Sequence, residues 1–348
     1  MPGVAAAPLP RGDRMSGNLP MAGGEGPLRL EYAAPGATPA LRRRPLLPPG
    51  PGMIRLDIAA CALNHADLLM AEGRYQERPE PPFTPGLEMA GTVGAAGAGV
   101  EAPRIGARVV LYAGHGGLAE AANVPADLCL PVPEGLPLAE AAAIPVTYGT
   151  AHLALARRAR LAPGERLVVT GAAGGAGRAA VEIGAAMGAE VVAVARGAER
   201  LEVARAAGAR HLIDASETEG DALRDRLRAL GGADVVYDTV GGATWEALFR
   251  AARPEARLLP VGFAGGDIPQ IPANHLLVKN LSVIGFNWGG YRAFAPEALT
   301  GSLAEVLGWA AAGRLSVHVG ARYPLARVEE ALAALRARAV PGKIVVEP

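Results

Sequence analysis

Residues 167–196 read LVVTGAAGGAGRAAVEIGAAMGAEVVAVAR. A short apolar run comes first, followed by a glycine-rich turn, a helix-forming segment and a second apolar run. In this order, the first free N–H groups of the helix and the positive end of its dipole face the turn, and glycines let the backbone approach a phosphate closely. Turns of this composition also join strands and helices for packing reasons alone. The strand-turn-helix context favours a dinucleotide-binding turn formed by Gly171, Gly174, Gly175 and Gly177.

The residue after the second apolar run indicates which dinucleotide binds. NAD sites usually place Asp or Glu there, about 20 residues beyond the glycines, to bind the ribose hydroxyl. This chain has Arg196 instead, and Arg200 follows one helical turn later. Two guanidinium groups suit a 2′-phosphate, so the sequence predicts NADPH. The alternative is a solvated pair at a helix start, since arginines are mostly surface residues.

The spacing of apolar residues indicates two structural units. Before about residue 145, short alternating segments predict the strands of a compact β-rich unit, at residues 53–59, 90–93, 107–112 and 128–132. After residue 151, helical and strand patterns alternate, which is typical of a doubly wound parallel sheet. The predicted helices are 181–187, 201–207, 223–230 and 245–252, and the predicted strands are 191–195, 211–213, 234–238 and 256–261.

Three further elements follow the predicted parallel sheet. Helical stretches at 303–312 and 328–338 and a strand at 343–347 are expected to return to the β-rich unit. Residues 1–27 are rich in proline and glycine with few large apolar residues, so we expect a disordered extension. The sequence thus predicts an α/β protein with a β-rich unit at 28–147 and 290–348 and a dinucleotide-binding unit at 148–289.

Composition limits the classes of function. The 348 residues suffice for two domains, half of them are hydrophobic, and the formal net charge is zero. A neutral chain gives no electrostatic reason to bind nucleic acid or an anionic membrane. The longest uncharged run, residues 141–156, is shorter than a membrane span. Cys61 and Cys129 form neither a disulfide framework nor a zinc spacing, so we expect a reducing, cytoplasmic setting.

Motifs in both halves carry a resemblance to a known family. The chain contains CALNHAD at 61–67, GRY at 73–75, PGLE at 85–88, ADVVYDTVGG at 233–242, VGF at 261–263, IGFNWGG at 284–290 and PGK at 341–343. In these motifs it resembles the medium-chain dehydrogenase/reductase superfamily, and within it the zinc-free NADPH:quinone oxidoreductase, or zeta-crystallin-like, group. The resemblance covers about residues 28–348. It implies a GroES-like catalytic domain joined to a Rossmann domain with a doubly wound parallel sheet.

Two positions of the resemblance bear on metal binding. Zinc-dependent members of the superfamily carry a cysteine where this chain has Asn64 and a histidine where it has Leu87. Leucine cannot bind a metal, and an amide oxygen is a poor zinc ligand beside thiolate and imidazole. The four closely spaced cysteines of a structural zinc lobe are also missing from the sequence. We therefore expect no metal site and no alcohol oxidation through zinc.

Without a Lewis acid, the hydride acceptor has to be electron-poor already. Quinones and α,β-unsaturated carbonyls meet this requirement, because a hydrogen-bond donor can stabilise the oxyanion that develops on hydride addition. The resemblance implies that Asn64 and Tyr75 are catalytic residues that line the acceptor pocket. Their amide and hydroxyl can orient a carbonyl, and the tyrosine ring can stack on a flat acceptor. The alternative is that Asn64 caps a helix starting near Ala66 and that Tyr75 is half-buried packing.

The resemblance also implies cofactor contacts outside the glycine turn. The carboxyl ends of strands and the linker between domains are where a doubly wound sheet binds its ligand. Relatives often carry an aromatic residue at or near Asp214, and a carboxylate there disfavours a nearby phosphate. The implied contacts are Thr150 near the domain crossing, Gly241 and Gly242 after the strand ending at Asp238, Phe263 at the next strand end, and Lys343 near the C-terminus.

Two classes of function stay open. The first is an NADPH-dependent oxidoreductase acting on quinones, with reduction of enones or enoyl thioesters as the nearest rival. The second is a crystallin-like protein that binds NADPH without significant turnover. We also expect a homodimer, because LSVIGF at residues 281–286 predicts an apolar strand near the sheet edge, and such an edge is usually paired or covered.

Overall fold

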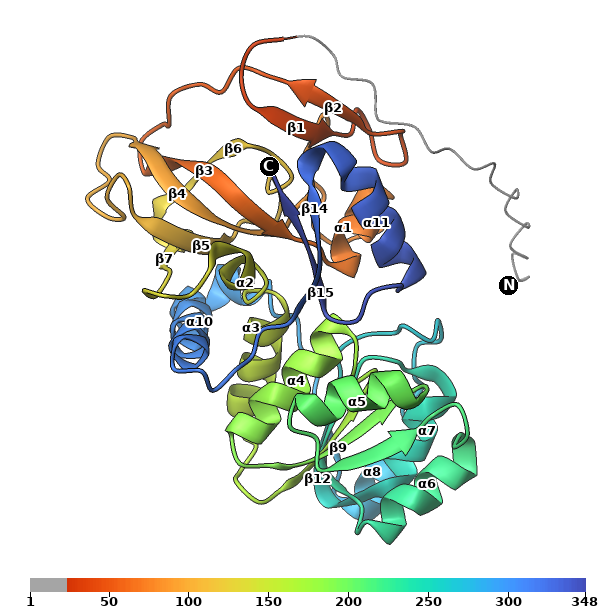
Figure 1. The fold of residues 1–348 in the computed structure, drawn as a ribbon. Coiled ribbons are helices and arrows are strands. Elements are labelled where there is room, and N and C mark those ends of the chain that lie inside the picture. Colours follow the sequence, from red (N-terminus) through yellow and green to blue (C-terminus); the bar gives the residue numbers. More distant parts are fainter. Residues whose placement is uncertain (1–23) are drawn as a thin grey trace.

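The computed structural model describes residues 24–348, which form two large sheets, one above the other in Figure 1. Most of the expected extension at 1–27 lies outside the described residues. At its end, Arg43 Nη1 donates a hydrogen bond of 3.0 Å to Gly26 O, and Arg44 N donates one of 3.3 Å to Pro27 O. The last residues before the first strand therefore lie beside Arg43 and Arg44.

The upper, β-rich half is a seven-stranded sheet in the order β14-β15-β3-β4-β5-β7, with β6 also paired to β3. Buried Ile54, Leu56 and Ile58 alternate with Arg55 and Asp57, so one face of β3 packs inward and the other is more open to solvent. The strands are β3 (Met53–Ala62), β4 (Glu88–Ala96), β5 (Arg108–Tyr112), β6 (Ala121–Pro125), β7 (Leu130–Pro131), β14 (Val319–Pro324) and β15 (Lys343–Glu347). The hairpin β1 (Leu28–Glu31) and β2 (Ala40–Arg43) and the helices α1 (His65–Ala71), α2 (Leu138–Ala142) and α11 (Val328–Ala337) complete this half.

The lower half is a six-stranded parallel sheet in the order β10-β9-β8-β11-β12-β13. This is the strand order of a doubly wound dinucleotide-binding fold, so the predicted fold class is confirmed. The strands are β8 (Arg166–Thr170), β9 (Glu190–Ala195), β10 (His211–Asp214), β11 (Ala233–Asp238), β12 (Ala252–Pro260) and β13 (Ser282–Val283). The helices are α4 (Gly175–Ala186), α5 (Ala198–Ala206), α6 (Gly220–Ala229), α7 (Gly242–Ala251) and α8 (Ala273–Lys279).

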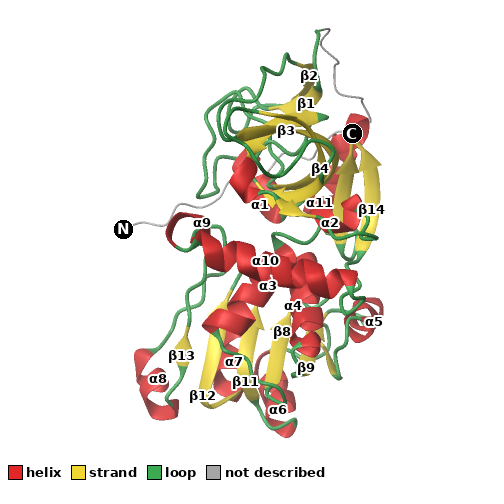
Figure 2. Cartoon of the chain, turned by 90° about the vertical axis from the view of Figure 1, so that its left-hand side faces the viewer, coloured by secondary structure: helices red, strands yellow, loops and turns green. Residues whose placement is uncertain are grey.

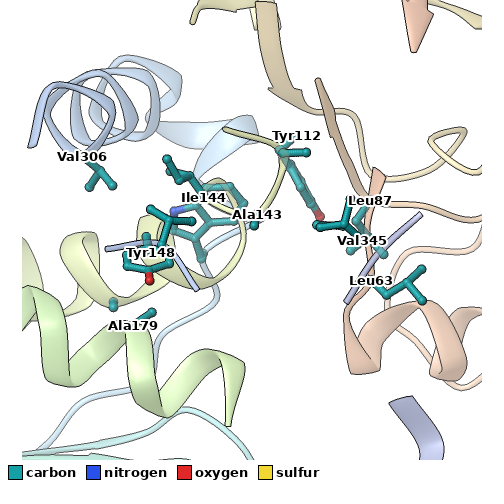
Figure 3. Packing of buried hydrophobic residues seen from close by; sticks show 14 of the residues in the cluster. Leu63, Leu87, Tyr112, Ala143, Ile144, Tyr148, Ala179, Val306 and Val345 are labelled. Atoms are coloured by element: carbon teal, nitrogen blue, oxygen red, sulfur yellow. The ribbon is translucent and has the colours of Figure 1, made fainter. Parts of the chain in front are cut away.

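Helices between the two sheets join them. These are α3 (Thr147–His152), which continues into the π-helical segment η2 (Leu153–Arg158), and α9 (Tyr291–Phe294) and α10 (Pro296–Ala311). Figure 2 shows α3 and α10 between the two sheets, where α10 packs on α3 and η2. One hydrophobic cluster runs through this region, from Leu63 and Leu87 past Tyr112 and Ile144 to Ala179 (Figure 3). Helix α3 runs across the expected boundary between the two units at 147/148, and α10, which follows the expected boundary at 290, packs on α3. Both boundaries therefore stay predictions.

Two features of the fold differ from the expectations. The expected strand at 281–286 is only two residues long, β13, although it does lie at the sheet edge. Beyond it, Ile284 N still donates to Leu258 O at 2.8 Å, and the chain then leaves the sheet. The short strands β1, β2, β6 and β14 were not expected from the apolar pattern. Among the described residues, no helix is both long and apolar enough to span a bilayer.

Candidate functional site

The glycine turn connects β8 to α4, as the sequence predicts, and two of its glycines, Gly171 and Gly177, leave no space for a Cβ. Gly171 has a φ of +59°, and a Cβ there would lie 2.4 Å from Thr239 Oγ1. A Cβ on Gly177 would lie 2.2 Å from Gly171 O, so the first turn of α4 rests on the backbone of the turn. Gly174 occupies the N-cap of α4. The free N–H groups of α4 therefore lie next to a tight turn made of glycine and alanine residues, which suits a pyrophosphate.

The β-rich half contacts this turn directly. Gly174 forms a parallel bridge with Gly342, and a Cβ on Gly175 would lie 3.4 Å from Lys343 Cδ and 3.6 Å from Thr147 Cγ2. The sequence-predicted Thr150 lies almost one helical turn beyond Thr147 and is half-buried. Thr147 therefore lies next to the turn, and sequence reasoning missed it. Its spacing of three residues from Thr150 in one helix is the signal that was available.

A second loop lies beside the glycine turn, at the end of β11. Asp238, which is fully buried, accepts hydrogen bonds from Val240 N and Gly241 N at 3.0 Å each and from Thr170 Oγ1. Burial raises the pKa of Asp238, and these three hydrogen bonds oppose that rise. The carboxylate thereby ties the loop to the end of β8.

Gly241, Gly242 and Phe263 meet at this second loop. A Cβ on Gly241 would lie 2.8 Å from Asp267 O and 3.4 Å from Phe263 Cδ1, and Gly242 N donates to Asp267 O at 3.2 Å. The phenyl ring of Phe263 stays 44% exposed. The carboxyl ends of β8, β11 and β12, three neighbours in the sheet, therefore form one crevice edge, which is where this fold binds its ligands.

Arg196 follows β9 directly, and Arg200 lies in the first turn of α5; both are exposed. Arg196 Nη2 lies 3.6 Å from Glu219 Oε1, an exposed pair with little intrinsic strength. Asp214 lies close by at the end of β10, and its Oδ1 accepts hydrogen bonds from Gly197 N at 2.9 Å and Ser216 N at 2.8 Å. The bond from Gly197 is the main cause that lowers the pKa of Asp214, so a carboxylate faces the loop that carries Arg196.

A buried ionic network lies across from the glycine turn. Lys343 Nζ donates to Asn64 Oδ1 at 2.7 Å and to Leu63 O and Glu88 Oε1 at 2.8 Å each. Asn64 Nδ2 donates to Glu88 Oε1 at 2.8 Å and to Ala62 O at 3.3 Å. All three N–H groups of Lys343 and both of Asn64 are thus used inside the protein.

This network bears on the roles expected for two residues, and those roles stay predictions. Asn64 has no free N–H to orient a substrate carbonyl, and Lys343 has none for a cofactor, because each group already binds an internal partner among the described residues. Glu88 Oε2 also accepts a hydrogen bond of 2.7 Å from Val146 N, just before α3. The three side chains therefore fix the strand β4, the entry to α1 and the segment next to the glycine turn relative to one another.

Asp67 holds the start of α1 from within the protein. Its Oδ2 accepts a hydrogen bond from Asn64 N at 2.8 Å and its Oδ1 one from Gly86 N at 2.9 Å. The side chain is almost fully buried, and burial raises the pKa of Asp67 to about 7 despite these bonds. Asn64 is the N-cap residue of α1, as expected in the alternative in which it caps a helix.

Leu87 belongs to the large hydrophobic cluster, and Tyr75 packs against that cluster. Tyr75 is half-buried, and burial, followed by the nearby Glu77, raises its pKa to about 12. Leu87 is buried in the apolar cluster that also contains Leu63 and Tyr112 (Figure 3). In the part of the chain that the structure describes, no three His, Cys, Asp or Glu side chains are grouped so that they could hold a metal ion.

A second buried network, which the sequence did not reveal, anchors α4. Tyr148 of α3 donates to Glu182 Oε2 at 2.8 Å, and Arg178 Nη2 lies 2.7 Å from Glu182 Oε1. Ser316 Oγ accepts a hydrogen bond of 2.9 Å from Arg178 Nη2. The available signal was the charged pair that Arg178 and Glu182 form one helical turn apart in α4. The other partners of Arg178 lie 30 and 138 residues away along the chain, so no local pattern indicates them.

Comparison with known proteins identifies the family. Residues 50–134 match the alcohol dehydrogenase GroES-like domain, and residues 175–304 match the zinc-binding dehydrogenase domain. The chain is 36% identical over 300 residues to quinone oxidoreductase-like protein 2 of Bos taurus, which covers 86% of both proteins. The chain belongs to the medium-chain dehydrogenase/reductase superfamily. Its relatives place it in the quinone oxidoreductase group of that superfamily.

Solved structures of this superfamily share the whole described fold. The quinone oxidoreductase of Thermus thermophilus, which was also solved in complex with NADPH, is 34% identical with a TM-score of 0.80 and covers 92% of this chain and 100% of its own. The Escherichia coli quinone oxidoreductase complexed with NADPH is 27% identical with a TM-score of 0.83 and the same coverage. The predicted family and the two-domain fold are therefore confirmed.

Proposed function

We propose that the protein is a zinc-independent oxidoreductase that binds NADPH and transfers its hydride to a quinone. The observation that carries this proposal is the glycine turn at the carboxyl edge of the parallel sheet, with Arg196 and Arg200 at the end of the next strand. Relatives named quinone oxidoreductases, two of them solved with NADPH, support the same cofactor and acceptor class. NADPH, when bound, supplies the hydride.

The residues next to the turn support chemistry without a metal. The two positions where zinc-dependent relatives carry ligands hold Asn64, whose amide is engaged with Lys343 and Glu88, and Leu87, which is buried. Neither side chain is a useful zinc ligand here. The acceptor therefore has to be activated by its own conjugation, which favours a quinone or an α,β-unsaturated carbonyl.

Each site residue then has a role that fits its contacts. Gly171, Gly174, Gly175 and Gly177 leave space for the pyrophosphate, and Arg196 and Arg200 bind the 2′-phosphate. Gly241, Gly242 and Phe263 form the wall of the cofactor crevice on the β11 and β12 side. We assign Asn64 and Lys343 to positioning rather than to direct contact, and we assign Tyr75 to the acceptor pocket. Thr150 is kept as a candidate contact one turn beyond Thr147.

Two alternatives make different predictions. Reduction of enones or enoyl thioesters uses the same hydride source and needs the same electron-poor acceptor. A crystallin-like role needs cofactor binding but no turnover. The exposed Phe263 and the half-buried Tyr75 leave aromatic surface at the site, and this favours the enzymatic role with a flat acceptor.

The test is steady-state NADPH oxidation with a panel of benzoquinones and naphthoquinones beside a panel of acyclic enones and enoyl thioesters. The proposal expects turnover with quinones at higher kcat/KM than with the second panel, unchanged after dialysis against a chelator. Faster turnover of enones would favour the first alternative, and NADPH binding without turnover of any compound would favour the second. Loss of activity on chelation would contradict zinc independence.

A further inference from the structure

Residues 315–318 connect α10 to β14 and lie beside α4, the helix that begins at the glycine turn. Leu315 and Val317 are buried in the large hydrophobic cluster, whereas Ser316 and His318 alternate with them and are exposed. This alternation is that of an extended chain, in which neighbouring side chains point to opposite sides. Ser316 and His318 are therefore available to contact other elements, and each of them contacts one end of the glycine turn's surroundings.

Ser316 binds a buried ion pair on α4. Its Oγ accepts a hydrogen bond of 2.9 Å from Arg178 Nη2 and donates one of 2.5 Å to Glu182 Oε1. The side chains of Arg178 and Glu182 are only 8% and 5% exposed. The hydroxyl of Tyr148, which points toward α4 in Figure 3, accepts a hydrogen bond of 3.1 Å from Arg178 Nη1 and donates one of 2.8 Å to Glu182 Oε2. The ion pair thus fastens α3 and residues 315–318 to the first two turns of α4.

His318 contacts the β-rich half where that half meets the glycine turn. Its carbonyl accepts a hydrogen bond of 3.0 Å from Lys343 N, and a Cβ on Gly342 would lie 2.4 Å from His318 Cδ2. Gly342 forms a bridge with Gly174, the N-cap of α4, and Gly174 O accepts a hydrogen bond of 2.7 Å from Arg178 N. These contacts close a ring, which runs through Arg178, Ser316, His318, Gly342 and Gly174.

The ring includes the first turn of α4, whose free N–H groups face the glycine turn. Tyr148 also follows Thr147 directly, and Thr147 Cγ2 lies 3.6 Å from where a Cβ on Gly175 would be. Both neighbours of the turn, Thr147 on α3 and Gly342 in the β-rich half, are therefore held through the same ion pair. Backbone N–H groups bind an oxyanion well only in a narrow range of angles, so a turn that is held in place before the ligand arrives binds it at a lower cost.

We propose that Arg178, Glu182 and Ser316 are positioning residues for the dinucleotide, which hold the glycine turn in the shape that binds the pyrophosphate. Their polar groups bind one another and Tyr148, so they act through the turn and not by contact with the cofactor. NADPH and NADH share the pyrophosphate, so these residues should affect both dinucleotides equally, unlike Arg196. The inference rests on the proposed function, because it takes the glycine turn as the pyrophosphate site.

The experiment measures the dissociation constants of NADPH and NADH by fluorescence titration in wild type, Ser316→Ala and Ser316→Thr. Ser316→Ala removes the link to α4 but leaves Arg178 and Glu182 paired at 2.7 Å, so the fold should be kept. Both dissociation constants should rise by the same factor, roughly 2- to 30-fold. Ser316→Thr keeps the hydroxyl and should bind both dinucleotides like wild type. Ser282→Ala, at an exposed serine of β13 outside the ring, is the matched control.

A second variant tests the ion pair itself. Arg178→Lys keeps the charge beside Glu182, but an ammonium group lacks the planar fork through which the guanidinium binds Tyr148 and Ser316 together. Both dissociation constants should rise in this variant as well. Urea unfolding without cofactor separates positioning from stability, because a purely structural role would lower the free energy of unfolding and leave both dissociation constants unchanged.

Four results would overturn the proposal. They are unchanged dissociation constants in Ser316→Ala, a loss restricted to NADPH, a Ser316→Thr variant as impaired as Ser316→Ala, and an equal loss in Ser282→Ala. If wild type binds both dinucleotides but reduces no quinone, the proposed function fails while these titrations still decide on the ring.

Discussion

Lys343 Nζ lies 2.8 Å from Glu88 Oε1, and both side chains are almost completely buried. Lys343 comes from β15 near the end of the chain, and Glu88 comes from β4, 255 residues earlier. The stem of Lys343 lies beside the glycine turn, 3.4 Å from where a Cβ on Gly175 would be, and Glu88 also binds the backbone just before α3. This ion pair therefore links the β-rich half to the residues that border the cofactor crevice.

Removing one charge of this pair should destabilise the protein strongly. Lys343→Met leaves the Glu88 carboxylate buried without a counter-charge, so the free energy of unfolding in urea should fall by about 3–5 kcal/mol. Arg74→Met, which removes the exposed partner of Glu72 at 3.2 Å, is the matched control and should change it by less than about 1 kcal/mol. A loss below about 1 kcal/mol in Lys343→Met would mean that the pair is not held as described.

Asp67 should make stability depend on pH. Its pKa is about 7 in the folded protein against an ordinary value of 3.8, so between these values the native protein keeps a proton that the unfolded chain has released. The stabilisation is complete below pH 3.8 and is lost as the pH rises through 7, by at most about 1.4 kcal/mol per pH unit. Urea unfolding of wild type across this range should show that decline, and Asp67→Asn should lack it. The exposed Asp57→Asn serves as control, and equal slopes in wild type and Asp67→Asn would refute the shift.

The glycine turn should not tolerate a methyl group at Gly177. The new Cβ would lie 2.2 Å from Gly171 O, so the backbone of the turn has to move. We expect Gly177→Ala to lower the free energy of unfolding by about 1–3 kcal/mol and to weaken NADPH binding by more than about 10-fold. Gly301→Ala on the exposed face of α10, where the new Cβ has no described atom within 4 Å apart from its chain neighbours and the backbone of its own helix, should instead stabilise by about 0.5–1 kcal/mol. Normal NADPH affinity in Gly177→Ala would remove the turn from the cofactor site.

The edge of the parallel sheet should pair with a second copy of the chain. The edge strand β13 follows α8, on which Leu277 and Val278 are 79% and 76% exposed. Light scattering at micromolar concentration should give twice the chain mass, and Val278→Asp should shift the equilibrium toward monomer. Leu47→Asp, at an equally exposed apolar residue of the β-rich half, should not. A wild-type monomer would contradict the prediction.

The parallel sheet could be predicted because its pattern is local. Strands β8, β9 and β11 are runs of mostly buried residues next to helices of different period, and Gly171 and Gly177 mark the turn by composition alone. The N-cap position of Asn64 followed from the same kind of signal, since asparagine is a preferred residue at that position. The buried residues near Asn64 and Tyr75 could be located only through the family resemblance.

The contacts of the site could not be predicted, because they join residues far apart in the chain. Lys343 and Asn64 are 279 residues apart, and no local pattern indicates that Asn64 Oδ1 accepts one of the hydrogen bonds that Lys343 Nζ donates. The pairing of Tyr112 with Glu77 depends on close approach of Gly289, which becomes visible only once β5 is placed. Sequence patterns thus identified which residues matter more reliably than what their polar atoms bind.

We propose that Arg196 and Arg200 at the end of β9 bind the 2′-phosphate of NADPH. A fluorescence titration of NADPH and NADH against wild type, Arg196→Ala and Arg200→Ala tests this. Wild type should prefer NADPH, and Arg196→Ala should weaken NADPH binding by roughly 10- to 150-fold, the loss of one charge-assisted hydrogen bond, while NADH binding stays nearly unchanged. Arg200→Ala should act in the same direction more mildly, because its side chain is exposed and screened. A wild-type preference for NADH, or an equal loss of both cofactors in Arg196→Ala, would contradict this role of the two arginines and would make the carboxylate of Asp214 the residue that decides cofactor choice.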